Sequence, residues 1–145
     1  MPVLAWMFVI FAASTDLGSA EHTSRFLVPL LRWFNPHVSV ATIVFFQFLI
    51  RKAAHLSEYA ILAIILLRAV RSEMKGSLRL HAAMVFVVGA VYAITDEFHQ
   101  SFSAVRTASP RDVMIDSFGV LVGLAIYALV VKGKPARIAT VEARG

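Results

Sequence analysis

The sequence predicts an all-α fold, a polytopic helical bundle with four membrane spans, or five, and an interfacial or re-entrant segment at residues 24–50. The chain has 145 residues, 59% of them hydrophobic and 16% charged, with a mean hydropathy of +0.74. A soluble domain of this size has too little interior to bury so much apolar surface. The apolar runs also lack the strict alternation of β-barrel strands. We therefore expect one transmembrane domain over residues 1–145.

The charge balance and the absence of cysteine exclude several classes of protein. The net charge is +5, and the chain contains no cysteine. Basic residues lie between apolar runs, so they indicate membrane topology and lipid headgroups, and nucleic-acid binding is not expected. A disulfide scaffold and thiol chemistry are excluded because both need cysteine.

The first 50 residues predict one span and one segment of less regular structure. Met1–Thr15 is apolar apart from its last two hydroxyls, and continuing it to Ala20 gives the length of about 20 residues that a span needs. Ser24–Ile50 is interrupted by two prolines, and its first half carries the aromatic and basic residues of an interfacial segment. Its second half, Val38–Ile50, has three interpretations: a re-entrant or interfacial segment, the first part of the next helix, or a fifth span.

Three further spans follow, at Ala53–Leu67, Leu80–Thr95 and Asp112–Val131. The loop between the first two of these is strongly basic, with Arg68, Arg71, Lys75 and Arg79. Residues 132–145 form a polar, basic tail. The positive-inside rule places that loop, the tail and, for four spans, the N-terminus in the cytoplasm. Segments 16–52 and 97–111 then face outward.

Nearly every polar or ionisable side chain near a span falls at this outward face. The set comprises Lys52, His55, Glu58, Tyr59, Tyr92, Asp96, Glu97, His99, Gln100, Arg106, Ser109, Arg111, Asp112 and Asp116. Within each span these residues recur at intervals of three and four, so they form one stripe per helix. Ionisable stripes within spans usually face the bundle interior, so we expect the three stripes to meet there.

The stripe of the last span continues as Gly119-x-x-x-Gly123. Small residues at this spacing allow two helices to approach closely. The pair predicts either packing inside the bundle or contact between two copies in a homodimer.

Two roles are open for the polar set. His55, with Asp96 or Glu97, can supply general acid and base groups. Arg106 offers a bidentate fork for a phosphate, and Lys52 offers a point charge. The other predicted binding residues are Glu58, Tyr59, Tyr92, Gln100, Ser109, Asp112 and Asp116. The alternative is a structural ion-pair network that holds the helix ends together.

The same residues contain enough nitrogen and oxygen ligands for zinc or a harder divalent ion. However, no spacing in the chain matches a known metal motif, so neither a metal nor another cofactor is predicted. No serine, threonine or cysteine nucleophile motif is present either, which leaves open whether the protein is an enzyme.

An ordered set of motifs resembles the VanZ family of small bacterial membrane proteins. The set is Lys52-x-x-His55-x-x-x-Tyr59, Tyr92-x-x-x-Asp96-Glu97-x-x-Gln100-x-Phe102, Arg106, Ser109, Asp112 and Gly119-x-x-x-Gly123. It covers about half of the chain, from Lys52 to Tyr127. Two positions depart from the family pattern: Asp116 stands where asparagine is more usual, and Val105 where glycine is usual.

The resemblance implies a multi-pass protein of the bacterial inner membrane that is associated with resistance to teicoplanin-type glycopeptide antibiotics. With the outward polar set, it leads us to expect a protein that binds or modifies an anionic envelope lipid or a lipid-linked cell-wall precursor. One alternative is a membrane-embedded hydrolase or transferase acting on a phosphate-bearing lipid. A small four-helix transporter is the other, although transport needs acidic residues deep within a span.

Overall fold

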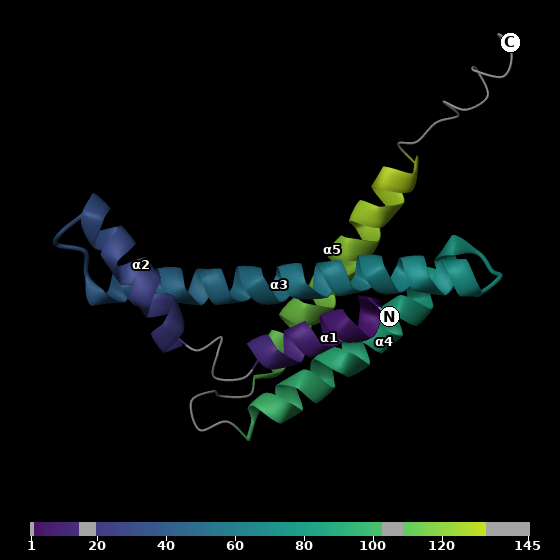
Figure 1. Ribbon diagram of the computed structural model, residues 1–145, viewed down its shortest axis with the longest axis horizontal. Helices are drawn as coiled ribbons and strands as arrows, with labels where there is room; N and C mark the ends of the chain where they lie inside the picture. Colours follow the sequence, from purple (N-terminus) through teal and green to yellow (C-terminus); the bar gives the residue numbers. More distant parts are fainter. Residues whose placement is uncertain (1, 15–19, 103–108, 133–145) are drawn as a thin grey trace, which may run out of the picture.

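The structure is a computed structural model that describes residues 2–14, 20–102 and 109–132. These residues form five helices and no strands: α1 (Pro2–Ala13), α2 (Ala20–Phe34), α3 (Val40–Glu73), α4 (Leu78–Gln100) and α5 (Pro110–Lys132) (Figure 1). The all-α prediction is confirmed. Of the described helices, α3, α4 and α5 are long and apolar enough to cross a membrane.

A fourth span at the N-terminus is not confirmed. Helix α1 is apolar but has only 12 residues. At a rise of 1.5 Å per residue it is about 18 Å long, whereas the hydrocarbon core of a bilayer is about 30 Å thick.

Of the three interpretations of Val38–Ile50, the structure confirms the second, because the stretch from Val40 onward forms the first part of α3 and is neither a separate re-entrant or interfacial segment nor a fifth span. Ser39 caps the helix, and its side chain accepts a hydrogen bond from the Thr42 amide. From Val40, α3 continues for 34 residues, a length of about 51 Å. Arg51 and Lys52, which separate the predicted segments Ser24–Ile50 and Ala53–Leu67, lie inside one continuous helix. Figure 1 shows the first turns of α3 extending beyond α1, α4 and α5.

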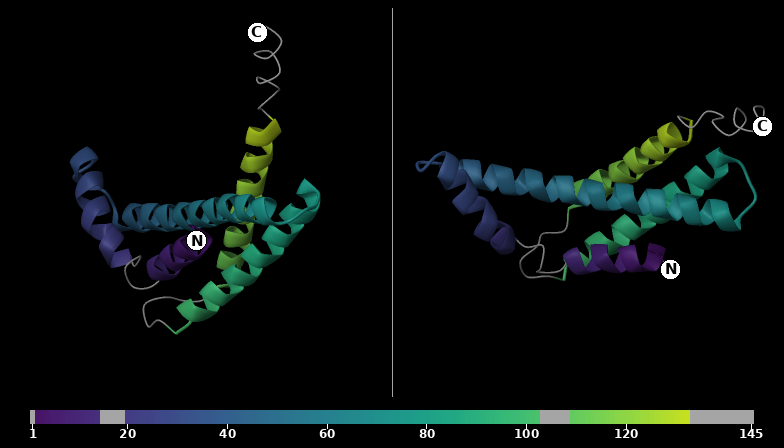
Figure 2. Two further views of the ribbon diagram at one scale, coloured as in Figure 1. Left: turned by 45° about the vertical axis from the view of Figure 1, so that its right-hand side comes forward. Right: turned by 45° about the horizontal axis from the view of Figure 1, so that its top comes forward.

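Helix α2 packs across this extended part of α3 (Figures 1 and 2). The Gln47 side-chain amide donates a 2.6 Å hydrogen bond to the Ser24 hydroxyl and so connects the two helices. Phe26 and Trp33 are exposed on α2, close in sequence to the exposed Arg25 and Arg32. A helix that combines large apolar and basic side chains in this way is typical of a membrane interface.

Helix α1 lies along α3 and α4 and is fixed by two hydrogen bonds to backbone carbonyls. The Trp6 indole donates to the Glu58 carbonyl at 2.9 Å, and the Tyr92 hydroxyl donates to the Met7 carbonyl at 2.6 Å. Ile10 is fully buried in the core beneath them. These contacts make α1 an integral part of the bundle, although it is too short to span alone.

Two glycines bring α5 against α3. A Cβ atom at position 119 would lie 2.6 Å from the Leu56 carbonyl oxygen, and one at position 123 would meet the Ala60 backbone. Gly119-x-x-x-Gly123 therefore packs inside the bundle, which is the first of its two interpretations. Because the two helices run in the same direction, residues that follow one another on α3 meet successive residues on α5.

Candidate functional site

Polar side chains from α3, α4 and α5, together with Ser14 directly after α1, meet where α4 ends and α5 begins. We call this group the polar cluster; it comprises Ser14, Lys52, His55, Tyr59, Asp96, Glu97, Gln100, Asp112 and Asp116. All of them except Lys52 are buried. The sequence places the α3 residues at the outer end of a span, but they lie near the middle of α3 because that helix begins at Val40. The extended part of α3 therefore continues past the polar cluster with exposed apolar side chains, among them Phe45 and Phe48.

Two pairs join α3 to α5. The Lys52 ammonium forms an ion pair with Asp112, and the Nδ1 atom of His55 lies 3.2 Å from the Asp116 Oδ1 atom. Asp116 is fully buried, whereas 21% of the Lys52 side chain is exposed. The i, i+3 spacing on α3 and the i, i+4 spacing on α5 therefore match across one interface, as two parallel stripes require.

Asp96 on α4 is held by two donors. The Ser14 hydroxyl donates to Asp96 Oδ2 at 2.7 Å, and the Gln100 side-chain amide donates to the same oxygen at 3.0 Å. Gln100 also donates to Ser14 at 3.3 Å. Ser14 is a member of the site that the sequence pattern did not predict. The available signal was a hydroxyl at the end of an otherwise apolar helix, which alone does not indicate its partner.

Replacing Ser14 with alanine is expected to lower the free energy of unfolding by about 1–3 kcal/mol. The change removes a hydroxyl that is buried against a carboxylate and leaves the Asp96 oxygen with one donor instead of two. Thermal unfolding of the purified protein in detergent measures the loss. Ser57→Ala is the matched control, because the Ser57 hydroxyl is exposed and bonds within its own helix. Equal effects of the two changes would contradict the role given to Ser14.

Glu97 links the end of α4 to the start of α5. One of its carboxylate oxygens accepts a 2.5 Å hydrogen bond from the Ser109 amide. The Ser109 hydroxyl in turn accepts from the Arg111 amide, and Pro110 begins the helix. Serine before a helix, proline at its first position and a nearby carboxylate are the features that stabilise a helix N-terminus. Glu97 and Ser109 therefore define where α5 starts.

Of the other predicted site residues, Tyr59 lies inside the polar cluster, whereas Tyr92 and Glu58 help to fix α1. Tyr59 is fully buried, and its hydroxyl has no hydrogen-bond partner among residues 2–14, 20–102 and 109–132. Its ring lies 6.1 Å from that of Tyr92, whose own hydroxyl is used to fix α1. Glu58 is half-buried, and its backbone carbonyl accepts a hydrogen bond from the Trp6 indole. Arg106 lies outside the described residues.

The polar cluster carries more acidic than basic groups. Four of its carboxyl groups are buried, those of Asp96, Glu97, Asp112 and Asp116. In the part of the chain that the structure describes, Lys52 is the one lysine or arginine in an ion pair with any of them. An ionised group taken out of water costs several kcal/mol unless it is paired or hydrogen-bonded, so the cluster needs additional cationic or donor groups.

A groove of about 420 Å³ lies beside the polar cluster, between the end of α4 and the start of α5. Its lining residues are Ile94, Glu97, Phe98, Ser101, Ser109, Pro110 and Val113. The wall is mainly apolar, but Glu97 and Ser109 connect it to the cluster. The groove can therefore take an apolar chain whose polar end lies next to charged groups.

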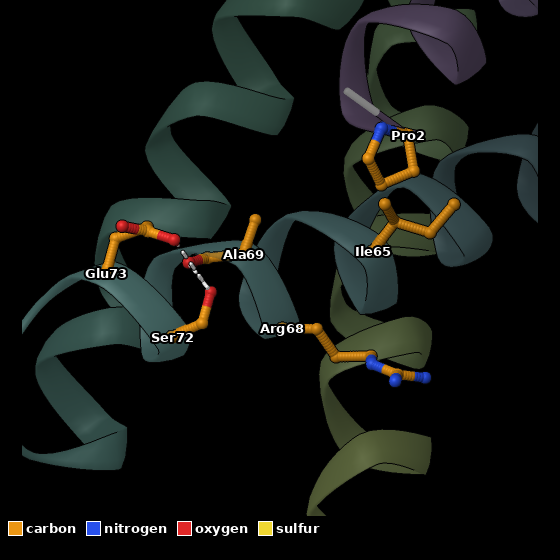
Figure 3. Close-up of a pocket in the computed structure, with 6 residues that line it drawn as sticks. All are labelled: Pro2, Ile65, Arg68, Ala69, Ser72 and Glu73. Atoms are coloured by element: carbon orange, nitrogen blue, oxygen red, sulfur yellow. Dashed lines mark hydrogen bonds between the residues drawn. The ribbon is translucent and has the colours of Figure 1, made fainter.

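A second cavity, of about 550 Å³, lies near the opposite end of α3 (Figure 3). Figure 3 shows the Ser72 hydroxyl bonded to the Ala69 carbonyl and to Glu73, while the Arg68 side chain points away from this group. Among the described residues that line it, Pro2 comes from α1 and the others come from α3. The cavity brings together few polar groups from different helices, so we do not assign the function to it.

Comparison with known proteins identifies the family. The VanZ/LLP1 family profile matches residues 1–131. No curated protein and no solved structure gives a significant match. The resemblance noted from Lys52 to Tyr127 is confirmed, and it extends over the N-terminal helices as well. The chain belongs to the VanZ/LLP1 family.

Proposed function

We propose that this protein binds the anionic headgroup of an envelope lipid, or of a lipid-linked cell-wall precursor, at the polar cluster. The observation that carries the proposal is the convergence of buried charged side chains from α3, α4 and α5 beside an apolar groove. A lipid phosphate has the same two parts, a charged head and an apolar chain. Lys52 supplies a partly exposed positive charge for the head. Arg106 lies outside the described residues, and its role as a second cation for the phosphate stays a prediction from the sequence.

The surroundings of the polar cluster favour a lipid over a water-soluble anion. Apolar side chains are exposed on both sides of it, with Phe45 and Phe48 on the extended part of α3 and Phe98 at the groove. Such surfaces are stable in contact with acyl chains and unstable in water. A lipid that diffuses in the outer leaflet can reach the cluster without leaving the membrane.

Orientation in the bilayer follows from charge. The C-terminal end of α3 carries Arg68 and Arg71, and Lys75 lies in the turn that follows; the positive-inside rule places this end of the helix in the cytoplasm. The polar cluster then opens toward the outer leaflet of the bacterial inner membrane, where lipid-linked wall precursors are used.

The test is a comparison of two lipids that share one tail. The full-length protein is reconstituted in phosphatidylcholine nanodiscs and titrated with a polyprenyl phosphate and with the matching polyprenol. Wild-type protein is expected to prefer the phosphate at least about tenfold, a difference of about 1.4 kcal/mol. The Lys52→Met/Asp112→Asn double variant removes the Lys52 ammonium that would bind the headgroup, and it leaves no unpaired carboxylate at position 112. We expect this variant to lose most of the preference for the phosphate.

Arg68→Gln, at the opposite end of α3, is the matched control and should keep the preference. Equal binding of the two lipids by wild-type protein would refute the proposal. Phosphate release during the titration, abolished by His55→Ala, would instead identify the hydrolase alternative.

The same lipid interaction predicts a phenotype. A host that produces the protein is expected to need a higher concentration of teicoplanin for growth inhibition than the same host with an empty vector. The Lys52→Met/Asp112→Asn variant should return the inhibitory concentration toward the vector value, while Arg68→Gln should not.

A further inference from the structure

Three side chains from three helices meet within the polar cluster: His55 of α3, Asp96 of α4 and Asp116 of α5. One nitrogen or oxygen atom from each lies within 4.8 Å of the other two. The residues are only 8%, 3% and 0% exposed, respectively. Imidazole nitrogen and carboxylate oxygen are the donor types that divalent metal ions use in proteins.

Hydrogen bonding leaves part of this group unsatisfied. Asp96 uses Oδ2 for both of its donors, and Asp116 uses Oδ1 for His55. Among the described residues, Asp96 Oδ1, Asp116 Oδ2 and the Tyr59 hydroxyl are buried without a hydrogen-bond partner. A purely structural ion-pair network would satisfy these oxygens, because each buried acceptor without a donor costs about 1–3 kcal/mol, and more when it is charged. A cation bound between His55, Asp96 and Asp116 would give both carboxylates a partner at once.

We propose that His55, Asp96 and Asp116 bind one divalent transition-metal ion of the zinc or manganese type. The 3.2 Å between His55 Nδ1 and Asp116 Oδ1 is close to the separation of two ligands on one ion, about 3.4 Å for tetrahedral bonds of about 2.1 Å. Ca²⁺ takes six to eight oxygen ligands, so one imidazole with two carboxylates suits it less well. Three protein ligands leave a coordination position for water or for another anionic ligand.

Ser14 and Gln100 act as positioning residues for this site. Both bond to Oδ2 of Asp96, which fixes the carboxylate and leaves Oδ1 directed to a different partner. Hydrogen-bonded second-layer groups of this kind orient metal ligands, and their loss typically weakens metal affinity 10–100-fold. Through Ser14, which directly follows α1, the N-terminal part of the chain would contribute to metal binding as well as to packing.

A bound cation also resolves a difficulty of the proposed function, and this step rests on that proposal. An anionic headgroup is repelled by a cluster that holds four buried carboxyl groups and one lysine. A divalent ion offsets the charges of Asp96 and Asp116, so the headgroup meets a site that is no longer acidic.

The experiment measures metal binding without any phosphate lipid other than phosphatidylcholine. Full-length protein in phosphatidylcholine nanodiscs is stripped with EDTA, desalted and titrated with Mn²⁺, followed by electron paramagnetic resonance, and with Zn²⁺, followed by calorimetry. We expect about one equivalent per chain. Asp96→Asn and Asp116→Asn should each weaken binding at least about tenfold, and Ser14→Ala about tenfold. Excess Mg²⁺ or Ca²⁺ should compete poorly.

Glu73→Gln is the matched control, since Glu73 is an exposed acid at the opposite end of α3 and should bind metal as wild type does. The asparagine variants keep the shape of aspartate and remove a buried charge, and size-exclusion profiles check that they fold. If either fails to fold, His55→Gln is expected to show the same loss of binding. Substoichiometric binding by wild type, or equal binding by wild type and both asparagine variants, would overturn the metal site. Because this experiment contains no anionic lipid, such a result would not contradict the expected preference for polyprenyl phosphate over polyprenol.

Discussion

Gly123→Val is expected to destabilise the bundle by about 3 kcal/mol, the upper end of the cost of overpacking a core. A Cβ atom at this position would lie 2.9 Å from both the Cα and the carbonyl carbon of Ala60. The obstacle is the backbone of α3, which cannot rotate away as a side chain can. Relief therefore requires α5 to move off α3, which separates Lys52 from Asp112 and His55 from Asp116. Unfolding in mixed detergent micelles, followed by circular dichroism, measures the effect.

Ala125→Val provides the matched control, because Ala125 is exposed two residues further along the same helix. The added volume is similar, but it faces outward, so we expect a change within about 0.5 kcal/mol. If Gly123→Val unfolded with the same midpoint as Ala125→Val, that result would contradict the close contact between α5 and the α3 backbone at position 123.

Lys52→Met is expected to cost about 3 kcal/mol, the lower end of the range for removing one partner of a buried ion pair. Asp112 would then be a buried carboxylate without its cation. The lower end applies because 21% of the Lys52 side chain and 11% of that of Asp112 are exposed. Asp112→Asn should cost less, since the long lysine side chain can extend toward water once it is released.

The double variant Lys52→Met/Asp112→Asn tests this account. Removing both charges removes the uncompensated carboxylate, so most of the stability lost in Lys52→Met should return. The free energies of unfolding of the two single variants and the double variant give the coupling energy. A double variant as unstable as the sum of the two single variants would show that the two side chains do not interact.

Local sequence patterns were sufficient for part of the fold. Composition and apolar run length predicted the membrane-type, all-α architecture, and the spans at Leu80–Thr95 and Asp112–Val131 lie inside α4 and α5. The residue intervals of three and four placed Lys52, His55 and Asp116 on stripes that do face one another. These signals work because a helix repeats every 3.6 residues, so a single helix already contains them.

Segment boundaries were predicted less well. The charges at Arg51 and Lys52 suggested a break, but the structure carries one helix through them from Val40 to Glu73. A charged residue is tolerated in the middle of a helix when another element supplies its partner, and Asp112 supplies it for Lys52. Nothing near Lys52 in the sequence reveals that partner.

The sequence by itself determined that the chain is helical, that it belongs in a membrane, which family it resembles, and which faces of its helices are polar. Only the tertiary structure decided that Ser14 bonds to Asp96, 82 residues away, and that His55, Asp96 and Asp116 share one buried point. The physical reason is that composition and helical periodicity are properties of neighbouring residues. A cluster built from three helices and the residue that follows α1 depends on how the helices cross, and their crossing is set by close contacts such as that of Gly123 with Ala60.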